Sequence, residues 1–87
     1  MRTVVLSHVA QVALDEAVAD GAFHRVGDAW MGLEWRLCRR PEDGVLMGPG
    51  LYIFHQDGFP GLEIPDIVVV YRFTSDLVEV VALRCTF

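Results

Sequence analysis

The chain has 87 residues, of which 53% are hydrophobic and 22% are charged. A chain of this length can bury one hydrophobic core but not two, so we predict a single domain over residues 1–87. Twelve acidic residues stand against seven arginines, which gives a net charge of −5 at pH 7. This balance excludes non-specific attraction to nucleic acid as the main source of binding, and the high apolar content favours a surface that meets a partner.

We expect neither a signal peptide nor a membrane-spanning segment in this sequence. Polar residues at positions 8, 11, 15 and 16 interrupt the apolar stretch that a signal peptide would need. No apolar run approaches the roughly 20 residues that span a bilayer. Cys38 and Cys85 stand alone without a CxxC motif, so we predict two reduced, buried thiols. We expect a soluble, cytoplasmic protein that needs no cofactor.

The first half of the chain predicts a short strand and a helix. Residues 3–6 are β-branched apart from Leu6, which suits a short strand. Ser7 can then cap a helix that ends near residue 19, where Gly21 offers a left-handed stop. The apolar residues expected on one face of this helix are Val9, Val12, Ala13 and Ala17.

The clearest periodic pattern in the chain predicts a second helix. Its apolar stripe has spacings of three, four, three and four residues, and consists of Phe23, Val26, Trp30, Leu33 and Leu37. Pro41 stops the helix after three arginines that the helix dipole favours near its C-terminus. About three residues separate the two helices, so they should fold back as an antiparallel hairpin.

The second half predicts strands separated by glycine and proline. Residues 51–55 form one strand after a brief extended piece at 45–47, and residues 77–84 form the last. Residues 67–74 are so apolar that they predict a central strand buried on both faces. The predicted fold is α+β: an N-terminal strand, a helical hairpin and an antiparallel sheet, in the order β-α-α-β-β-β.

Several motifs resemble the RelE/ParE superfamily, the toxins of bacterial type II toxin–antitoxin pairs, and its YoeB-like branch most of all. They are Leu37 to Arg40 followed by Pro41-Glu42-Asp43-Gly44, the strand start Gly50-Leu51-Tyr52, and Val69-Val70-Tyr71 leading through Thr74-Ser75-Asp76 to Val81-Ala82-Leu83-Arg84. The resemblance covers nearly the whole chain in pattern and about the last 20 residues in motif. It requires the helical hairpin to pack on one face of the sheet and the last two strands to be antiparallel neighbours.

The resemblance implies two possible targets. RelE-like and YoeB-like toxins are ribosome-dependent endoribonucleases that cleave mRNA, whereas ParE-like toxins keep the fold and inhibit DNA gyrase. Both kinds are neutralised by an antitoxin segment that wraps the domain. The expected partners are therefore an antitoxin and either the ribosome with its mRNA or DNA gyrase, with no membrane.

The residues that could cleave RNA form an incomplete set. Arg84 matches an arginine of the family, and Arg72 could join it in holding a phosphate. Glu63 and His55 are the candidates for proton transfer. The C-terminal tail, Cys85-Thr86-Phe87, lacks the histidine and tyrosine that the resemblance would supply. The alternative is that these residues have no catalytic role. The two arginines would then pair with Glu79 or Asp76, the glutamate would be a solvated loop residue, and the histidine would only end a strand.

Partner binding has better candidates than metal binding. Trp35 lies five residues from Trp30 and cannot share its face, so we expect Trp35 to be exposed. The one basic cluster consists of Arg36, Arg39 and Arg40. It could contact RNA or an acidic antitoxin stretch, or it could only stabilise the C-terminal end of the helix. The three histidines are too far apart in sequence for a metal motif, so no metal is predicted.

The sequence is compatible with three functional hypotheses. The first is a toxin, or a degenerate relative, that acts mainly by protein–protein contact. The second is a ribosome-dependent endoribonuclease with an atypical site. The third is a small homodimeric binding domain unrelated to toxins, for which an edge strand at residues 3–6 or 51–54 could accept a partner strand.

Overall fold

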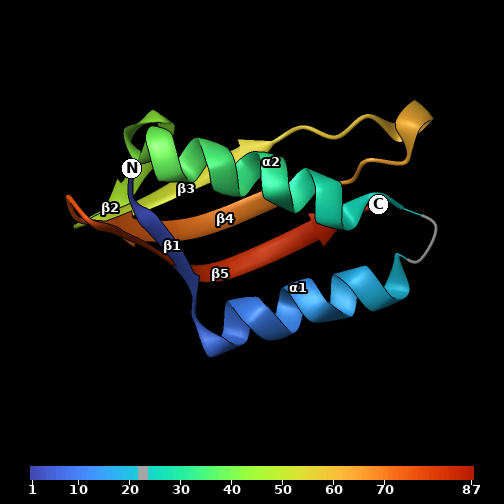
Figure 1. Cartoon of the computed structure of the whole chain (residues 1–87), viewed down its shortest axis with the longest axis horizontal. Helices are drawn as coiled ribbons and strands as arrows, with labels where there is room; N and C mark the ends of the chain where they lie inside the picture. Colours follow the sequence, from blue (N-terminus) through green and yellow to red (C-terminus); the bar gives the residue numbers. More distant parts are fainter. Residues whose placement is uncertain (22–23) are drawn as a thin grey trace.

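The computed structural model describes residues 1–21 and 24–87. Its two α-helices are α1 (His8–Asp20) and α2 (Val26–Arg39), and two short 3-10 turns cover Pro41–Asp43 and Pro60–Leu62. The strands are β1 (Thr3–Leu6), β2 (Val45–Gly48), β3 (Leu51–Gln56), β4 (Asp66–Phe73) and β5 (Leu77–Thr86), as Figure 1 shows. None of the described helices is long and apolar enough to cross a membrane.

The five strands form one mixed sheet in the order β1-β5-β4-β3-β2. The strands β2 to β5 pair with antiparallel neighbours, as predicted, whereas β1 pairs in parallel with β5. The α+β class is confirmed, but the expectation of a purely antiparallel sheet is wrong. The reason is the connection: two helices follow β1, and a crossover of this length allows a parallel neighbour where a tight turn would not.

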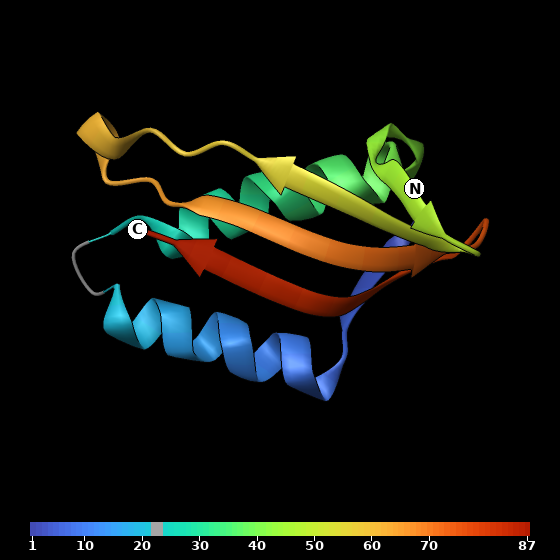
Figure 2. The same cartoon turned by 180° about the vertical axis from the view of Figure 1, so that it is seen from behind.

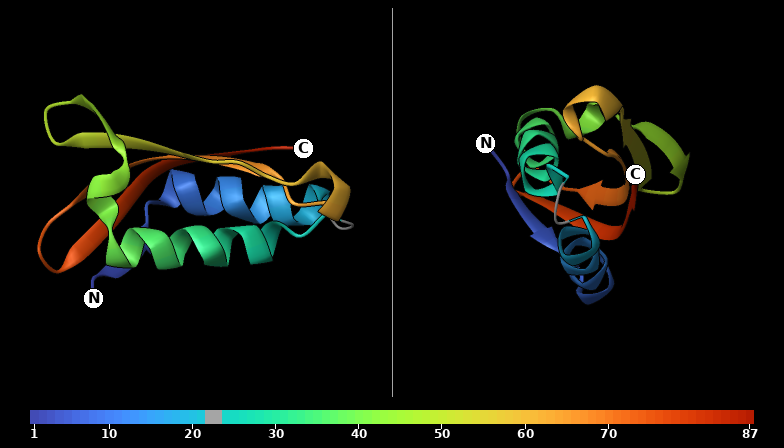
Figure 3. Two further views of the ribbon diagram at one scale, coloured as in Figure 1. Left: turned by 90° about the horizontal axis from the view of Figure 1, so that it is seen from above. Right: turned by 90° about the vertical axis from the view of Figure 1, so that its right-hand side faces the viewer.

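Both helices cover the same face of the sheet and run in opposite directions (Figures 1 and 3). The predicted stripe of α2 is confirmed where the structure describes it, since Val26, Trp30, Leu33 and Leu37 are all buried. Phe23 lies outside the described residues. The side chains of α2 meet those of the two central strands in one core, whose strand members are Ile67, Val69, Tyr71, Val78, Val80 and Leu83.

The predicted buried face of α1 is wrong in part. Its buried residues are Ala10, Leu14 and Ala17, whereas Val9 is 67% exposed. The apolar residues of this helix point in most directions around its axis, so their spacing does not define a single buried face. Small alanines on the buried side allow the helix to pack beside β5. The predicted cap is confirmed: the Ser7 hydroxyl accepts a hydrogen bond from the Ala10 amide at 3.1 Å.

Gly21 ends α1 for a different reason from the one predicted. Its φ is −95°, so it is not in the left-handed region. A Cβ at this position would lie only 2.7 Å from the ring of Phe87 and 2.9 Å from the Ala17 carbonyl oxygen. The glycine is needed for this close approach between the end of α1 and the C-terminal residue.

Strand β4 is central, as predicted, but it is buried on one face only. Burial alternates along it, with Ile67, Val69 and Tyr71 buried and their neighbours partly exposed. In Figure 2, α2 lies behind the sheet and α1 lies below β5, and no described element lies in front of the sheet, on the side that we call the open face. The register places His55, Val68 and Arg84 side by side on the open face, across β3, β4 and β5.

Candidate functional site

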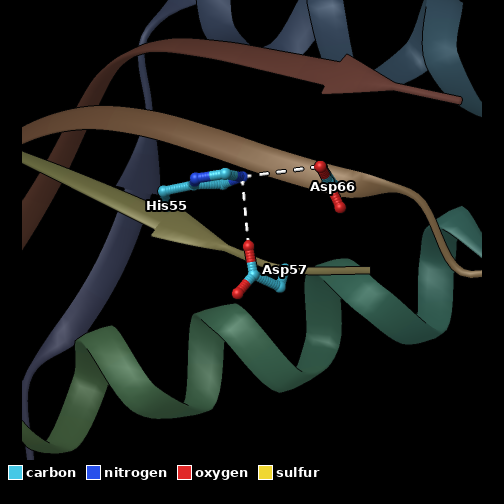
Figure 4. A group of neighbouring side chains, drawn as sticks. All are labelled: His55, Asp57 and Asp66. Carbon is cyan, nitrogen blue, oxygen red and sulfur yellow. Dashed lines mark ion pairs between the residues drawn. The ribbon is translucent and has the colours of Figure 1, made fainter. Parts of the chain in front are cut away.

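Three polar side chains converge at one end of the open face (Figure 4). His55 lies near the end of β3, Asp57 follows that strand, and Asp66 begins β4. The His55 Nε2 atom lies 3.5 Å from Asp57 Oδ1 and 3.6 Å from Asp66 Oδ2. All three side chains are partly or largely exposed, so solvent and ligands can reach the cluster.

The loop between β3 and β4 holds this cluster together. The Gly58 amide donates a hydrogen bond to Asp66 Oδ1 at 2.5 Å, and Phe59 pairs with Ile64 across the loop. Gly58 can approach closely because it has no side chain: a Cβ there would lie 2.7 Å from the Pro65 carbonyl oxygen. The closed loop therefore fixes the end of β3 against the start of β4.

The structure brings together two of the four predicted catalytic residues. His55 and Arg84 are both neighbours of Val68, so they lie two strands apart, about 10 Å by ordinary strand spacing. Arg72 lies on the same face but four residues further along β4, about 13 Å from Val68. The Arg72 side chain pairs with Glu79 on β5 at 2.5 Å, as the structural alternative predicted.

Glu63 uses its backbone rather than its carboxylate. It adopts a left-handed conformation (φ 59°), and its carbonyl oxygen accepts a hydrogen bond from the Arg25 amide at 2.7 Å. This bond ties the β3–β4 loop to the start of α2. In the part of the chain that the structure describes, the Glu63 carboxylate makes no ion pair, and it borders a hollow of about 120 Å³ beside Phe87.

A groove of about 580 Å³ runs between α2 and the outer edge of β3. Strand β2 pairs with β3 only as far as Ile53, which leaves the backbone edge of the following residues unpaired by β2. Arg36 lies over the ring of Phe54 in this groove, 4.8 Å from its centre. The pattern of the sequence did not predict the groove, because it depends on how far β2 extends along β3.

The outer surface of α2 carries two large exposed apolar residues one turn apart. Met31 is 66% exposed and Trp35 is 59% exposed, whereas Trp30 is buried, so the predicted division of the two tryptophans is confirmed. The Arg39 guanidinium lies 4.4 Å from the centre of the Trp35 ring. We refer to Met31, Trp35 and Arg39 as the α2 outer surface.

The other two predicted partner-binding residues lie beside this surface. Arg36 points to the groove described above. Arg40 forms an exposed ion pair with Asp43, with 3.4 Å between Arg40 Nε and Asp43 Oδ1. Trp35 and these arginines also border a hollow of about 280 Å³ at the end of α2.

A second apolar surface lies on the edge strand β2. Val45, Leu46 and Met47 are each more than half exposed, and β2 is the last strand of the sheet on its side. An exposed apolar edge presents unpaired backbone groups together with apolar side chains, which is how sheets recruit a further strand. The sequence predicted an extended piece here and expected the accepting edges at residues 3–6 and 51–54. Residues 3–6 do form the other edge strand, β1, whereas β2 covers residues 51–53 of β3.

The two thiols are free, as predicted, but partly buried rather than fully buried. Burial raises the pKa of the Cys85 thiol, so the thiolate is disfavoured there. The Cys38 thiol donates a hydrogen bond to the Arg2 carbonyl oxygen at 2.9 Å. These environments favour structural thiols over nucleophiles.

No protein-family model matches the sequence, and a search of curated proteins gives no match either. Of the three clustered residues, only His55 stands out in the sequence as a candidate site residue, and the structure places Asp57 and Asp66 beside it. The only sequence indication was the Asp57-Gly58 turn dipeptide, and the strand register that brings Asp66 to His55 cannot be obtained from spacing alone.

Proposed function

We propose that this chain is a toxin component of a type II toxin–antitoxin pair, or a degenerate relative, that acts mainly by protein–protein contact. The observation that carries the proposal is the exposure of Trp35, with Met31 one turn before it and Arg39 over its ring. Tryptophan and arginine are enriched where protein interfaces gain most of their affinity. The partner proposed for this surface is an antitoxin segment.

The arrangement of the elements supports the proposed relationship to the RelE/ParE superfamily. Both helices pack on one face of the sheet, and β4 and β5 are antiparallel neighbours from Asp66 to Phe73. These are the two conditions that the resemblance sets. The match of Arg84 to the family arginine and the position of the turn before β5 add to this support.

The chemistry around α2 suits an acidic, amphipathic segment. Met31 and Trp35 supply apolar contact area, and positive charge comes from three arginines within five residues of Trp35, namely Arg36, Arg39 and Arg40. The chain as a whole has a net charge of −5, so this local positive charge would orient a negatively charged partner. An antitoxin of this chemistry would bind along α2 and its C-terminal end.

Induced expression in a bacterial host tests the proposal. The chain is expressed alone and together with any neighbouring short reading frame, and growth, bulk translation and DNA supercoiling are followed. Growth arrest that the neighbour relieves is the expected result, with altered supercoiling indicating gyrase and lost translation indicating the ribosome. Unperturbed growth with no complex between the two products would contradict a toxin role.

Two variants locate the binding surface. In Trp35→Ala, the dissociation constant for the neighbouring product should rise at least about tenfold, as is usual when a central interface tryptophan is truncated. Leu62→Ala is the matched control, because Leu62 is similarly exposed but lies in the β3–β4 loop. Equal affinities for both variants, measured by titration calorimetry, would exclude the α2 outer surface as the binding site.

A second candidate function is ribosome-dependent cleavage of mRNA. The observation that favours it is the shared row of His55 and Arg84 on the open face, which pairs a proton-transfer group with a phosphate-binding group. Primer extension on mRNA bound to ribosomes should then show cleavage that His55→Ala and Arg84→Ala each remove. Arg2→Ala is the control, because the Arg2 side chain donates a hydrogen bond to the Thr74 carbonyl oxygen, beyond the end of β4 that lies away from His55. No cleavage by the unaltered chain would exclude this candidate.

A third candidate is a homodimer that pairs through the edge strand β2. Its exposed apolar side chains, Val45, Leu46 and Met47, would be covered by the same strand of a second copy. Sedimentation equilibrium should then give twice the chain mass for the unaltered protein and the monomer mass for Leu46→Arg. A monomer at all concentrations would exclude it.

A further inference from the structure

We propose that His55, Asp57 and Asp66 form a binding site for a divalent first-row transition-metal ion, best matched to Zn²⁺. The site goes beyond the proposed partner-binding function, because it lies at the end of β3 and β4 rather than on the α2 outer surface. One ring nitrogen and two carboxylate oxygens, one from each residue, all lie within 4.8 Å of one another.

The spacing of these atoms fits the coordination geometry of Zn²⁺. Ligand bonds of about 2.0–2.2 Å place two neighbouring tetrahedral ligands about 3.4 Å apart. The observed separations from His55 Nε2 are 3.5 Å to Asp57 Oδ1 and 3.6 Å to Asp66 Oδ2, so both are close to this value. Asp57 is 88% exposed and can turn to bring its oxygen closer to that of Asp66.

The backbone already orients one of the ligands. The Gly58 amide holds Asp66 Oδ1, which leaves Oδ2 directed at the His55 ring (Figure 4). A hydrogen bond of this kind to the second oxygen of a ligating carboxylate lowers the cost of ordering it when the ion arrives. Asp66 is also the first residue of β4, so its backbone is fixed by the sheet.

The charge balance favours a cation at this place. The structure brings two carboxylates close together, and among the described residues no arginine pairs with either of them. The chain has no lysine and a net charge of −5. An ion of charge +2 would offset the repulsion between Asp57 and Asp66, which His55 can do only in its protonated form.

The choice of metal follows from the ligand types. Mg²⁺ and Ca²⁺ prefer sites made only of oxygen ligands, whereas an imidazole nitrogen with two carboxylates suits Zn²⁺ and its neighbours in the first transition row. Three protein ligands leave at least one position for water or for an anionic group of a ligand. The exposed position of the cluster allows such a group to approach.

Titration calorimetry of the full chain with ZnCl₂ tests the proposal. Saturable binding of one ion per chain is expected, and His55→Ala and Asp57→Ala should each weaken it by at least about tenfold. The matched controls are His8→Ala and Asp15→Asn, which remove a histidine and a carboxylate from α1 without touching the cluster. Both controls should bind Zn²⁺ like the unaltered chain.

A second measurement separates this site from the two thiols, which also bind Zn²⁺. Mn²⁺ prefers oxygen and nitrogen ligands, so MnCl₂ should broaden the NMR signals of His55 and its neighbours on β3 and β4 before those near Cys38 or Cys85. Circular dichroism checks that each variant is folded. Two results would overturn the site. One is a Zn²⁺ affinity that is unchanged in both His55→Ala and Asp57→Ala, and the other is Mn²⁺ broadening that starts elsewhere in the chain.

Discussion

The hydroxyl of Tyr71, in the middle of the sheet, donates a hydrogen bond to the carbonyl oxygen of Pro41, directly after α2. The Tyr71 side chain is completely buried, and its hydroxyl oxygen lies 2.5 Å from that carbonyl oxygen. The bond joins the central strand to the point where the chain leaves the helical layer. It therefore holds the end of α2, with its arginines, in a fixed position over the sheet.

Removal of this hydroxyl should destabilise the fold. Tyr71→Phe leaves the Pro41 carbonyl without its buried donor, so we expect the free energy of unfolding to fall by about 1–2 kcal/mol. Urea denaturation followed by circular dichroism measures the change. Tyr52→Phe is the matched control, because the Tyr52 ring packs against Tyr71 but its hydroxyl makes no hydrogen bond within the described residues. Equal losses in the two variants would show that the bond to Pro41 adds no stability.

Gly44 should tolerate no side chain, because the Tyr71 hydroxyl occupies the space. A Cβ at Gly44 would overlap that hydroxyl and lie 3.0 Å from the Ile53 carbonyl oxygen. We expect Gly44→Ala to lower the free energy of unfolding by about 1–3 kcal/mol, and by less in a Tyr71→Phe background where the clash is reduced. Gly27→Ala is the control, since a Cβ there meets nothing within 4 Å and should stabilise α2. Additive losses in the double variant would contradict this steric explanation.

The same tyrosine predicts a loss of stability at high pH. Burial raises the pKa of Tyr71 from 10.0 to about 12, because the phenolate would lose its hydration. The unfolded chain therefore releases this proton first. The corresponding stability is fully present below about pH 10 and is lost as the pH rises towards about 12, with a size of about 2–3 kcal/mol. Urea midpoints across this range should fall more steeply for the unaltered chain than for Tyr71→Phe, and parallel curves would contradict the prediction.

The ion pair between Arg72 and Glu79 should contribute little to stability. The two residues are register neighbours on β4 and β5, but the Arg72 side chain is 61% exposed. A double-mutant cycle with Arg72→Ala and Glu79→Ala should give a coupling of about 0.2–1 kcal/mol that declines with added salt. A coupling that salt does not change would show that the pair is less solvated than its exposure indicates.

The sequence predicts elements where one physical pattern dominates. The stripe of α2 has a clear helical period, and Ser7 can satisfy free amides at the start of α1, so both features are found where they were expected. The buried face of α1 could not be predicted, because valines and alanines surround that helix. The composition of β4 alone wrongly predicts burial on both faces, although the expected packing of the helical hairpin on one face of the sheet already implies that the other face of β4 is exposed.

The candidate site was predictable only in part. His55 stands out as a titratable group at a strand end, and the open face then joins it to Arg84 through the register. Asp57 and Asp66 lie nine residues apart, and only the closed loop between β3 and β4 brings their carboxylates together. Side-chain clusters of this kind depend on loop geometry, which has no periodic pattern in the sequence.

The two tryptophans should respond in opposite ways to substitution. Trp30 is 8% exposed in the core, so Trp30→Ala should cost about 3–5 kcal/mol of unfolding free energy. Trp35 is on the α2 outer surface, so Trp35→Ala should change stability by no more than about 0.5 kcal/mol while it weakens partner binding. The single-tryptophan variants Trp30→Phe and Trp35→Phe give an independent check by fluorescence. Iodide should quench Trp35, which remains in Trp30→Phe, more strongly than Trp30, which remains in Trp35→Phe. The reverse order would mean that Trp35 is covered, either by the fold or by a second copy of the chain.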